Sequence, residues 1–126
     1  MSQIRRAVLL VGFALCTSVV NLANAADPVI VLVRVFPTQG REDELQAQYL
    51  KRIEYLRKAE PGATFRLHRS AKEPITFLWY EVYESQAAYD NHLKIVMPAY
   101  RKEAGPTPEG LLAKPSESEA YSELGK

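Results

Sequence analysis

The first half of the chain contains a continuous apolar run and then a stretch with a helical spacing of apolar residues, and together they predict a strand followed by a helix. Residues 28–36, PVIVLVRVF, are rich in β-branched side chains and predict a strand that ends at Pro37. Over 42–59 the apolar residues are spaced by four, four and three positions, which is the stripe of an amphipathic helix. Acidic residues in the first turn and basic residues in the last suit the helix dipole. The stripe consists of Leu45, Tyr49, Ile53 and Leu56.

Three further strands are indicated in the second half of the chain. Residues 63–70 alternate between apolar and polar side chains, and residues 75–83, ITFLWYEVY, are rich in aromatic side chains. The four-residue link between these two segments predicts a hairpin. The polar C-terminal stretch alternates over 119–124, which predicts an edge strand.

A second helix is predicted between the hairpin and the tail. Ser85 is a suitable N-cap, and Pro98 is expected to interrupt the helix because proline lacks a backbone N–H. One further turn is possible over 99–104. The apolar side of this helix carries Ala88, Tyr89, His92, Leu93 and Val96.

The order β-α-β-β-α-β predicts an α+β, ferredoxin-like fold with an antiparallel sheet, formed by a single domain over residues 26–126. The strand 28–36 is apolar on both faces, with valines on one and Ile30, Leu32 and Phe36 on the other. Two helices can cover only one face of such a sheet. We therefore predict a homodimer in which two copies pack sheet against sheet.

The first 25 residues have the order of a secretory signal peptide. Arg5 and Arg6 precede an uncharged apolar run over 7–20, and the sequence ANA at 23–25 is a small-x-small cleavage site. The apolar run is shorter than the roughly 20 residues that a membrane-spanning helix needs. We expect cleavage after Ala25, no stable membrane anchor, and a periplasmic or secreted protein.

Composition narrows the possible partners of the mature chain. The only cysteine, Cys16, lies in the signal segment, so residues 26–126 contain no disulfide and no thiolate ligand or nucleophile. Arg5 and Arg6 are two of the 16 basic residues, which leaves 14 basic against 15 acidic residues and a net charge of about −1. This balance offers no basic surface for nucleic acid or for an anionic membrane.

Several kinds of chemistry have no motif in this chain. It contains no glycine-rich phosphate loop, no nucleophile elbow and no dinucleotide fingerprint. His68 and His92 are far apart and match no zinc spacing, so no metal site is expected. The remaining reactive or recognition groups are these histidines, seven tyrosines and one tryptophan. A pocket built from such residues suits a flat, aromatic and largely apolar ligand.

The stretch EPGATFRLHRS at 60–70, followed by EPITFLWYEVYESQAAYDNHLK at 73–94, resembles the core of the antibiotic biosynthesis monooxygenase family, which includes quinol monooxygenases. The resemblance covers roughly residues 28–104 and continues more weakly to Tyr121. It implies a dimeric α+β barrel, built from ferredoxin-like subunits, that oxidises quinols or polyketide phenols with O₂. It also implies that no metal, flavin or haem takes part, so no cofactor is expected.

The same resemblance identifies His92 with the family's helix histidine, facing a pocket between helix and sheet. Two positions depart from the family pattern. Tyr83 stands where many relatives have tryptophan, which is a mild change. Met97 stands where many have a second histidine, five residues after the first, and this change removes a polar group near the pocket.

A mechanism follows in outline from the available groups. A phenol or quinol reacts with O₂ more readily once it is deprotonated, because the anion is the better electron donor. A neutral imidazole at His92 could take that proton, and positioned general bases are typically worth about 10²–10⁴ in rate. Trp79 and Tyr80 lie on opposite strand faces, so only one of them can line the pocket. The substrate-binding candidates are Trp79, Tyr80, Tyr83, Tyr89, Arg34, Glu81 and Met97.

Each candidate also has a structural interpretation. His92 could be a half-buried histidine bonded to a backbone carbonyl, and Trp79 and the tyrosines could be core or interface residues. Arg34 could pair with a carboxylate such as Glu81, which could itself be a structural acceptor. His68 is expected on the solvated surface. The solvated face of the first helix is expected to consist of Lys51, Arg52, Arg57 and Lys58.

Three functions are consistent with these observations. The first is a cofactor-independent monooxygenase that acts on a quinol or related aromatic compound. The second is a haem-binding or haem-degrading relative on the same fold, although such relatives carry an asparagine in the first strand and 28–36 has none. The third is a non-catalytic, exported dimer that binds a small molecule.

Overall fold

The computed structural model describes residues 27–125, and its elements follow the predicted β-α-β-β-α-β order, which confirms the ferredoxin-like α+β fold. The predicted signal peptide, residues 1–25, lies outside the described residues. The elements are β1 (Val29–Val35), α1 (Glu42–Ala59), β2 (Thr64–Arg69), β3 (Phe77–Tyr83), α2 (Gln86–Asn91), the π-helical turn η1 (His92–Val96), α3 (Met97–Ala104) and β4 (Glu117–Ser122).

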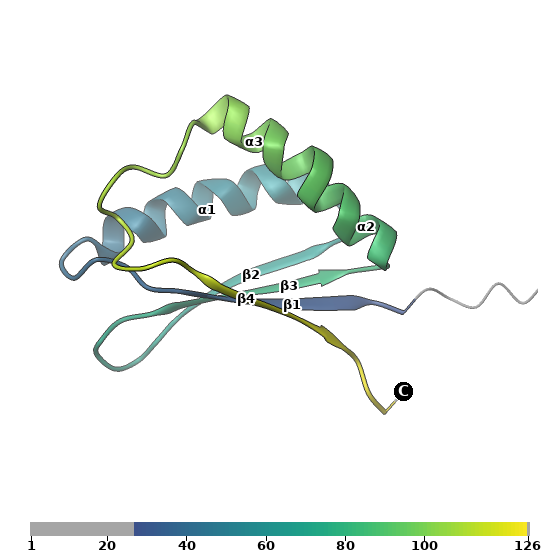
Figure 1. Ribbon diagram of the computed structural model, residues 1–126, viewed down its shortest axis with the longest axis horizontal. Coiled ribbons are helices and arrows are strands. Elements are labelled where there is room, and N and C mark those ends of the chain that lie inside the picture. Colours follow the sequence, from purple (N-terminus) through teal and green to yellow (C-terminus); the bar gives the residue numbers. More distant parts are fainter. Residues whose placement is uncertain (1–26, 126) are drawn as a thin grey trace, which may run out of the picture.

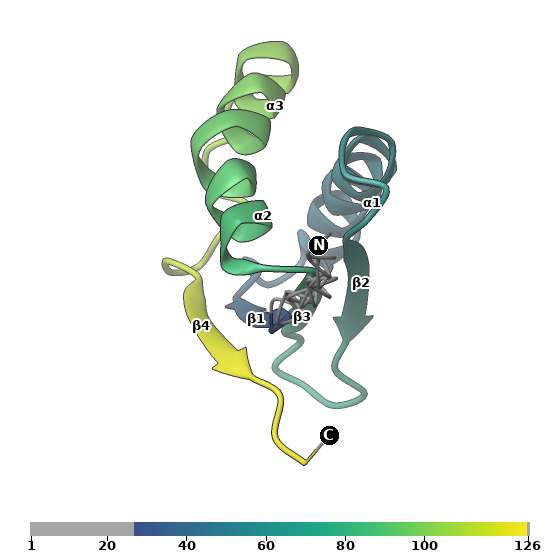
Figure 2. The same cartoon turned by 90° about the vertical axis from the view of Figure 1, so that its right-hand side faces the viewer.

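The four strands form one antiparallel sheet in the order β2-β3-β1-β4. Both helical segments lie on the same face of this sheet, as Figures 1 and 2 show, and the opposite face carries no helix. In β3 the side chains alternate strictly between the two faces, because successive residues of a strand point to opposite sides. Phe77, Trp79, Glu81 and Tyr83 face the helices and are buried.

The core lies between α1 and the covered face of the sheet. The predicted stripe of Leu45, Tyr49, Ile53 and Leu56 is buried along its whole length. It packs with the inward residues of the strands into one hydrophobic cluster. The strand residues of this cluster are Val31, Val35, Phe65, Phe77, Trp79 and Tyr83.

The second helix begins as predicted, since the Ser85 hydroxyl accepts a hydrogen bond from the Ala88 N–H at 3.1 Å. The expected interruption at Pro98 is wrong, because the helix continues to Ala104. A proline in a regular α-helix would clash with the carbonyl four residues before it. Here the chain widens into η1 just before Pro98, with the Met97 N–H bonded to the His92 carbonyl. The π turn therefore accommodates Pro98 inside a continuous helical rod.

The last strand, β4, pairs with β1 along the edge of the sheet. It starts and ends two residues earlier than the alternation predicted, and every residue in it is exposed. The segment that precedes it is held by Leu111, which is fully buried and whose carbonyl accepts a 2.9 Å bond from the Thr38 N–H. The Ala113 N–H donates to the Phe36 carbonyl at the same distance.

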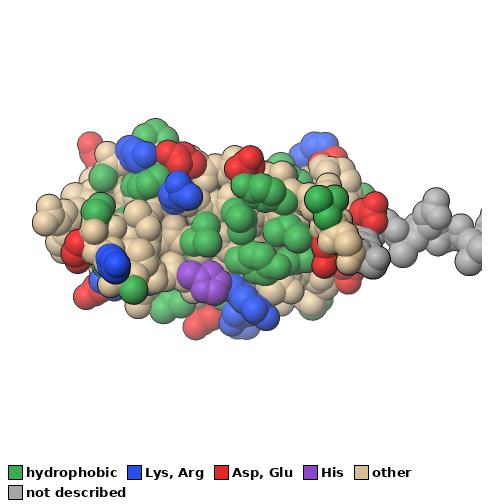
Figure 3. All heavy atoms as spheres, turned by 90° about the horizontal axis from the view of Figure 1, so that it is seen from below, with side chains coloured by type: hydrophobic (Ala, Val, Ile, Leu, Met, Phe, Trp, Pro, Cys, Tyr) green, Lys and Arg blue, Asp and Glu red, His purple; other side chains and the backbone are tan. Residues whose placement is uncertain are grey.

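The uncovered face of the sheet carries an apolar cluster, visible in the centre of Figure 3. The strand register places a charged rim around it, from Arg34, Arg66, Glu117 and Glu119. Among the helices of residues 27–125, none is long and apolar enough to cross a membrane. The apolar members of the cluster are Ile30, Leu32, Leu78, Tyr80, Val82 and Tyr121.

Candidate functional site

A cavity of ≈ 240 Å³ lies between the helices and the covered face of the sheet. Residues from α1, β1, β3, the second helical rod and β4 contribute to its walls. Five of the eight residues proposed for the site from the sequence line it together: His92, Trp79, Glu81, Tyr89 and Met97.

The remaining three proposed residues lie elsewhere. Tyr83 is fully buried and does not line this cavity, although its ring lies 5.1 Å from that of His92 between centroids. Tyr80 and Arg34 point to the uncovered face of the sheet, because each alternates with residues that face the helices. The choice between Trp79 and Tyr80 is thereby decided in favour of Trp79. Tyr80 and Arg34 do not belong to the cavity.

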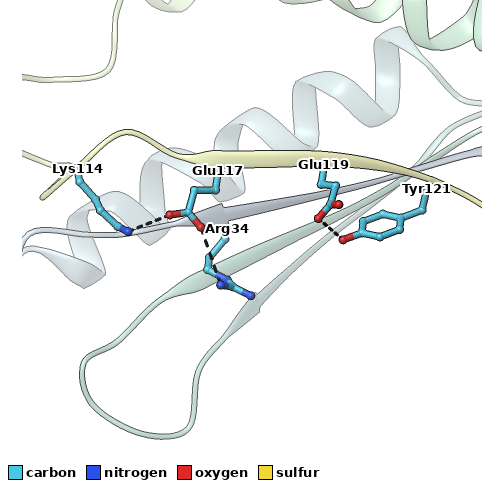
Figure 4. Close-up of polar contacts among 5 residues, drawn as sticks. All are labelled: Arg34, Lys114, Glu117, Glu119 and Tyr121. Atoms are coloured by element: carbon cyan, nitrogen blue, oxygen red, sulfur yellow. Dashed lines mark hydrogen bonds and ion pairs between the residues drawn. The ribbon is translucent and has the colours of Figure 1, made fainter.

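Arg34 forms an ion pair, though not the expected one. Its guanidinium lies 3.9 Å from Glu117 on β4, and Glu117 also binds Lys114 at 2.9 Å (Figure 4). Pairing with Glu81 was wrong, because Glu81 is on the opposite face of the sheet. His68 is exposed on β2, as predicted.

His92 makes the most specific polar contact of the cavity wall. Its Nδ1 lies 2.7 Å from Oε2 of Glu60, and the two side chains retain only 6% and 9% of their exposure. The structural interpretation of His92 as bonded to a backbone carbonyl is therefore wrong, since its partner is a carboxylate. A carboxylate accepts but does not donate, so the proton of this bond sits on Nδ1. In the neutral imidazole Nε2 is then the acceptor.

The position of Glu60 is informative in its own right. It follows the last residue of α1 as the C-cap, where the negative end of the helix dipole disfavours a carboxylate. Its spacing of four from Leu56 continues the buried stripe of α1. The sequence therefore indicated Glu60 as a buried partner for a polar group, because an acidic residue stands at a helix C-terminus and on the inward stripe of that helix. This indication was missed.

The imidazole of His92 is held by rings as well as by Glu60. Phe65 on β2 lies 5.9 Å away and Tyr83 on β3 lies 5.1 Å away between ring centroids. His92 is also the first residue of η1, and π turns within α-helices occur frequently at functional sites.

Glu81 is a second carboxylate in the cavity wall. The Tyr83 hydroxyl donates a 2.8 Å hydrogen bond to its Oε2. Burial raises the pKa of Glu81, while the hydrogen bond from Tyr83 and the positive charge of Arg52 act in the opposite direction. Burial and the neighbouring Glu81 raise the pKa of Tyr83 far above its ordinary value. Tyr83 is thus a neutral donor committed to Glu81, and the structural interpretation of Glu81 as an acceptor holds.

Tyr89 lines the cavity from α2, with its ring 5.1 Å from that of Tyr83. Partial burial, together with the negative charge of Glu81, raises the pKa of the Tyr89 hydroxyl. Within the described part of the chain the Tyr89 hydroxyl has no hydrogen-bond partner, so it is a candidate donor to a ligand. Among residues 27–125, no three His, Cys, Asp or Glu side chains cluster as metal ligands would.

Arg52 is a wall residue that the sequence interpretation placed in solvent. Its guanidinium carbon lies 4.8 Å from the Tyr49 ring centroid, 5.3 Å from that of Tyr100 and 5.7 Å from that of Trp79. The assignment to a solvated face is wrong, because Arg52 lies three residues after Tyr49 and four before Leu56. Both are helical neighbours on the buried stripe, and this spacing was the signal.

The fold and the cavity define the class: a ferredoxin-like α+β domain with an aromatic pocket between its helices and its sheet. The family model described as antibiotic biosynthesis monooxygenase matches residues 28–101, and the chain belongs to this family. Proteins of this family are commonly dimeric. No curated protein matches the chain.

Solved structures with the same fold include Rv0793 from Mycobacterium tuberculosis, which is 26% identical with a TM-score of 0.59 and matches 79% of this chain and 97% of that one. A proposed antibiotic biosynthesis monooxygenase from Caulobacter crescentus is 20% identical, with a TM-score of 0.62 over 80% and 93%. The haem degrader MhuD from M. tuberculosis, solved with two haems in its active site, is 18% identical, with a TM-score of 0.61 over 78% and 97%. The last two likenesses show the fold alone.

Proposed function

We propose that the protein is a cofactor-independent monooxygenase that oxidises a quinol or related phenol with O₂. One oxygen atom enters the ring as a hydroxyl group, and the other leaves as water. For a hydroquinone the product is the hydroxyquinone, and the four electrons that reduce O₂ all come from the substrate. The first step is loss of a phenolic proton, because the resulting anion is the better electron donor to O₂.

The observation that carries this proposal is the buried pair of His92 and Glu60. The bond to Glu60 fixes the proton on Nδ1 and leaves Nε2 to accept the phenolic proton. The imidazolium that results is stabilised by the carboxylate beside it, since opposite charges attract more strongly away from water. A base oriented by a third group is the general arrangement of an activated proton acceptor.

The walls of the cavity fit a small aromatic substrate. Trp79 and Met97 provide apolar contact area, and the Tyr89 hydroxyl is available as a donor. The volume of ≈ 240 Å³ lies just below the roughly 300–1,000 Å³ of pockets for drug-sized ligands. A ligand with one or two rings is therefore the best match.

The test is O₂ uptake by the purified protein with a panel of hydroquinones. We expect His92→Ala to lower the rate by about 10²–10⁴, the usual worth of a positioned base. His68→Ala is the matched control, because His68 is the other histidine and is exposed on the uncovered face of the sheet, away from the cavity. Sedimentation checks that this variant keeps the oligomeric state of the wild type. Equal rates for His92→Ala and the wild type would remove His92 from the mechanism.

Haem binding is the second candidate, and the fold likeness to MhuD is the observation that favours it. The carboxylate on Nδ1 would also orient His92 as a metal ligand through Nε2. The cavity of ≈ 240 Å³ is too small to enclose a tetrapyrrole. Titration with haem decides between the two: a Soret shift that His92→Ala abolishes supports haem binding, and absence of a shift together with quinol-dependent O₂ uptake supports the monooxygenase.

The working form that we propose is an exported homodimer. The uncovered apolar face of the sheet, ringed by charges, supports pairing of two copies through this face (Figure 3). Export after cleavage at Ala25 would place the protein where membrane quinols are accessible. N-terminal sequencing of the exported protein tests this, because the first residue is then Ala26.

A further inference from the structure

Two arginines occupy one end of the cavity, opposite the end that holds His92. Arg52 lines it from α1 and Arg101 from α3. Arg52 precedes Glu60 by eight residues, which is about 12 Å along a helix. The second helical rod runs the other way, since its Tyr100 meets Arg52 while its His92 meets Glu60. The cavity is therefore polarised, with a proton acceptor at one end and two cations at the other.

The positive charge of Arg52 acts on Glu81 across the cavity, but neither arginine is held in a direct ion pair within residues 27–125. The Nε of Arg52 is buried and has no hydrogen-bond partner. Glu81, the carboxylate that also lines the cavity, accepts its bond from Tyr83 instead.

An unpaired buried N–H is costly. The Nε is too deeply buried for a ligand to contact, so the part of Arg52 open to a ligand is the part of its side chain that lines the cavity. Packing explains only part of the side chain. The rings of Tyr49, Trp79 and Tyr100 contact the flat faces of the Arg52 guanidinium and fix its plane. They cannot accept the in-plane N–H bonds, which are the bonds that a guanidinium gives to a carboxylate in a bidentate pair.

We propose that the site takes an aromatic ligand that carries a carboxylate, bound by Arg52 and Arg101, with a phenolic hydroxyl directed to His92. This inference rests on the proposed function and narrows its substrate class to hydroxylated aromatic acids. One end of the cavity then binds the carboxylate of the ligand, and the other end binds its phenolic hydroxyl. The arginines orient the ring, and the imidazole receives the proton.

Binding can be measured without turnover, because Trp79 is the only tryptophan of the chain and lies under Arg52. We compare quenching of its fluorescence by 2,5-dihydroxybenzoate and by the methyl ester of that acid. The acid is expected to bind at least about tenfold more tightly, which corresponds to the lower end for hydrogen bonds to charged groups. Equal dissociation constants for the acid and the ester overturn the proposal.

Two variants test whether the arginines cause the preference for the acid over the ester. Arg52→Gln and Arg101→Gln should each reduce the preference for the acid, and Lys51→Gln is the matched control because it removes the same charge from an exposed neighbour on α1. Circular dichroism checks the fold, and Arg101→Gln, at an exposed residue, keeps the test valid if Arg52→Gln does not fold. A preference that survives in both arginine variants also overturns the proposal.

The outcome is separable from that of the proposed function. Tight, arginine-dependent binding of the acid without O₂ uptake sustains the anion site and refutes the monooxygenase. O₂ uptake with hydroquinone, without preference for the acid, sustains the monooxygenase and refutes the anion site.

Discussion

Removal of Glu60 is the perturbation that most directly probes the site. The His92–Glu60 bond is 2.7 Å long and both side chains are almost completely buried. A hydrogen bond to a charged group in such a place is worth about 1.5–3 kcal/mol. Glu60→Ala should therefore lower the free energy of unfolding by about that amount. For a domain of this size the corresponding fall in Tm is roughly 10 °C.

The same substitution should affect the reaction more specifically than it affects stability. Without Glu60 the imidazolium loses its charge partner, and the loss of 1.5–3 kcal/mol corresponds to a fall of about 10–150-fold in kcat/KM. Nitrogen NMR of the imidazoles adds a readout that a purely structural role would not change. We expect the Nδ1–H tautomer of His92 in the wild type and a mixture of tautomers in Glu60→Ala.

The assays are thermal unfolding, O₂ uptake and the NMR measurement, with Glu54→Ala as the control. Glu54 is an exposed residue of α1, so the control removes an equal charge from the same helix. An unchanged tautomer of His92 in Glu60→Ala would refute the assigned role of Glu60, as would a Tm and a kcat/KM equal to those of the Glu54 control.

Two further predictions concern the second carboxylate and the uncovered sheet. Burial holds the pKa of Glu81 above its unfolded value, so the folded state binds this proton more tightly and loses stability as the pH rises through and above the ordinary glutamate range. Glu81→Gln, which can still accept the Tyr83 bond, should raise the Tm at neutral pH but not below about pH 4; an unchanged or lower Tm at neutral pH would contradict this. Leu32→Glu, in the centre of the uncovered face, should convert the proposed dimer into a monomer in sedimentation, whereas Leu50→Glu on exposed α1 should not. A dimer that survives Leu32→Glu would exclude this face as the interface.

The order of the elements was predictable because α1 has a clear helical period, while β1 and β3 have the β-branched and aromatic composition of strands. The structure places α1 and β3 as expected. The sequence also identified Ser85 as a cap, since its side chain performs a local function.

The face that lines the cavity was not predictable from hydrophobicity. Strand β3 is apolar on both sides, because one side meets the helices and the other the uncovered patch. Alternation therefore separates Trp79 from Tyr80 without saying which one points inward. The charged residues Arg52 and Glu60 were overlooked for a related reason: charge normally indicates solvent, and only their helical spacing marked them as inward.

The π turn also changes the directions in which the side chains of the second helical rod point. In a regular α-helix, positions five apart differ in direction by about 140°, so Met97 would point away from His92. The wider turn over His92–Val96 absorbs one extra residue and shifts the angular phase of everything that follows. Within this rod, His92 and Met97 therefore line the same cavity although they are five positions apart, and Arg101 joins them one turn after Met97. One residue of surplus backbone thus brings a proton acceptor and a distant cation onto a common side of the same rod.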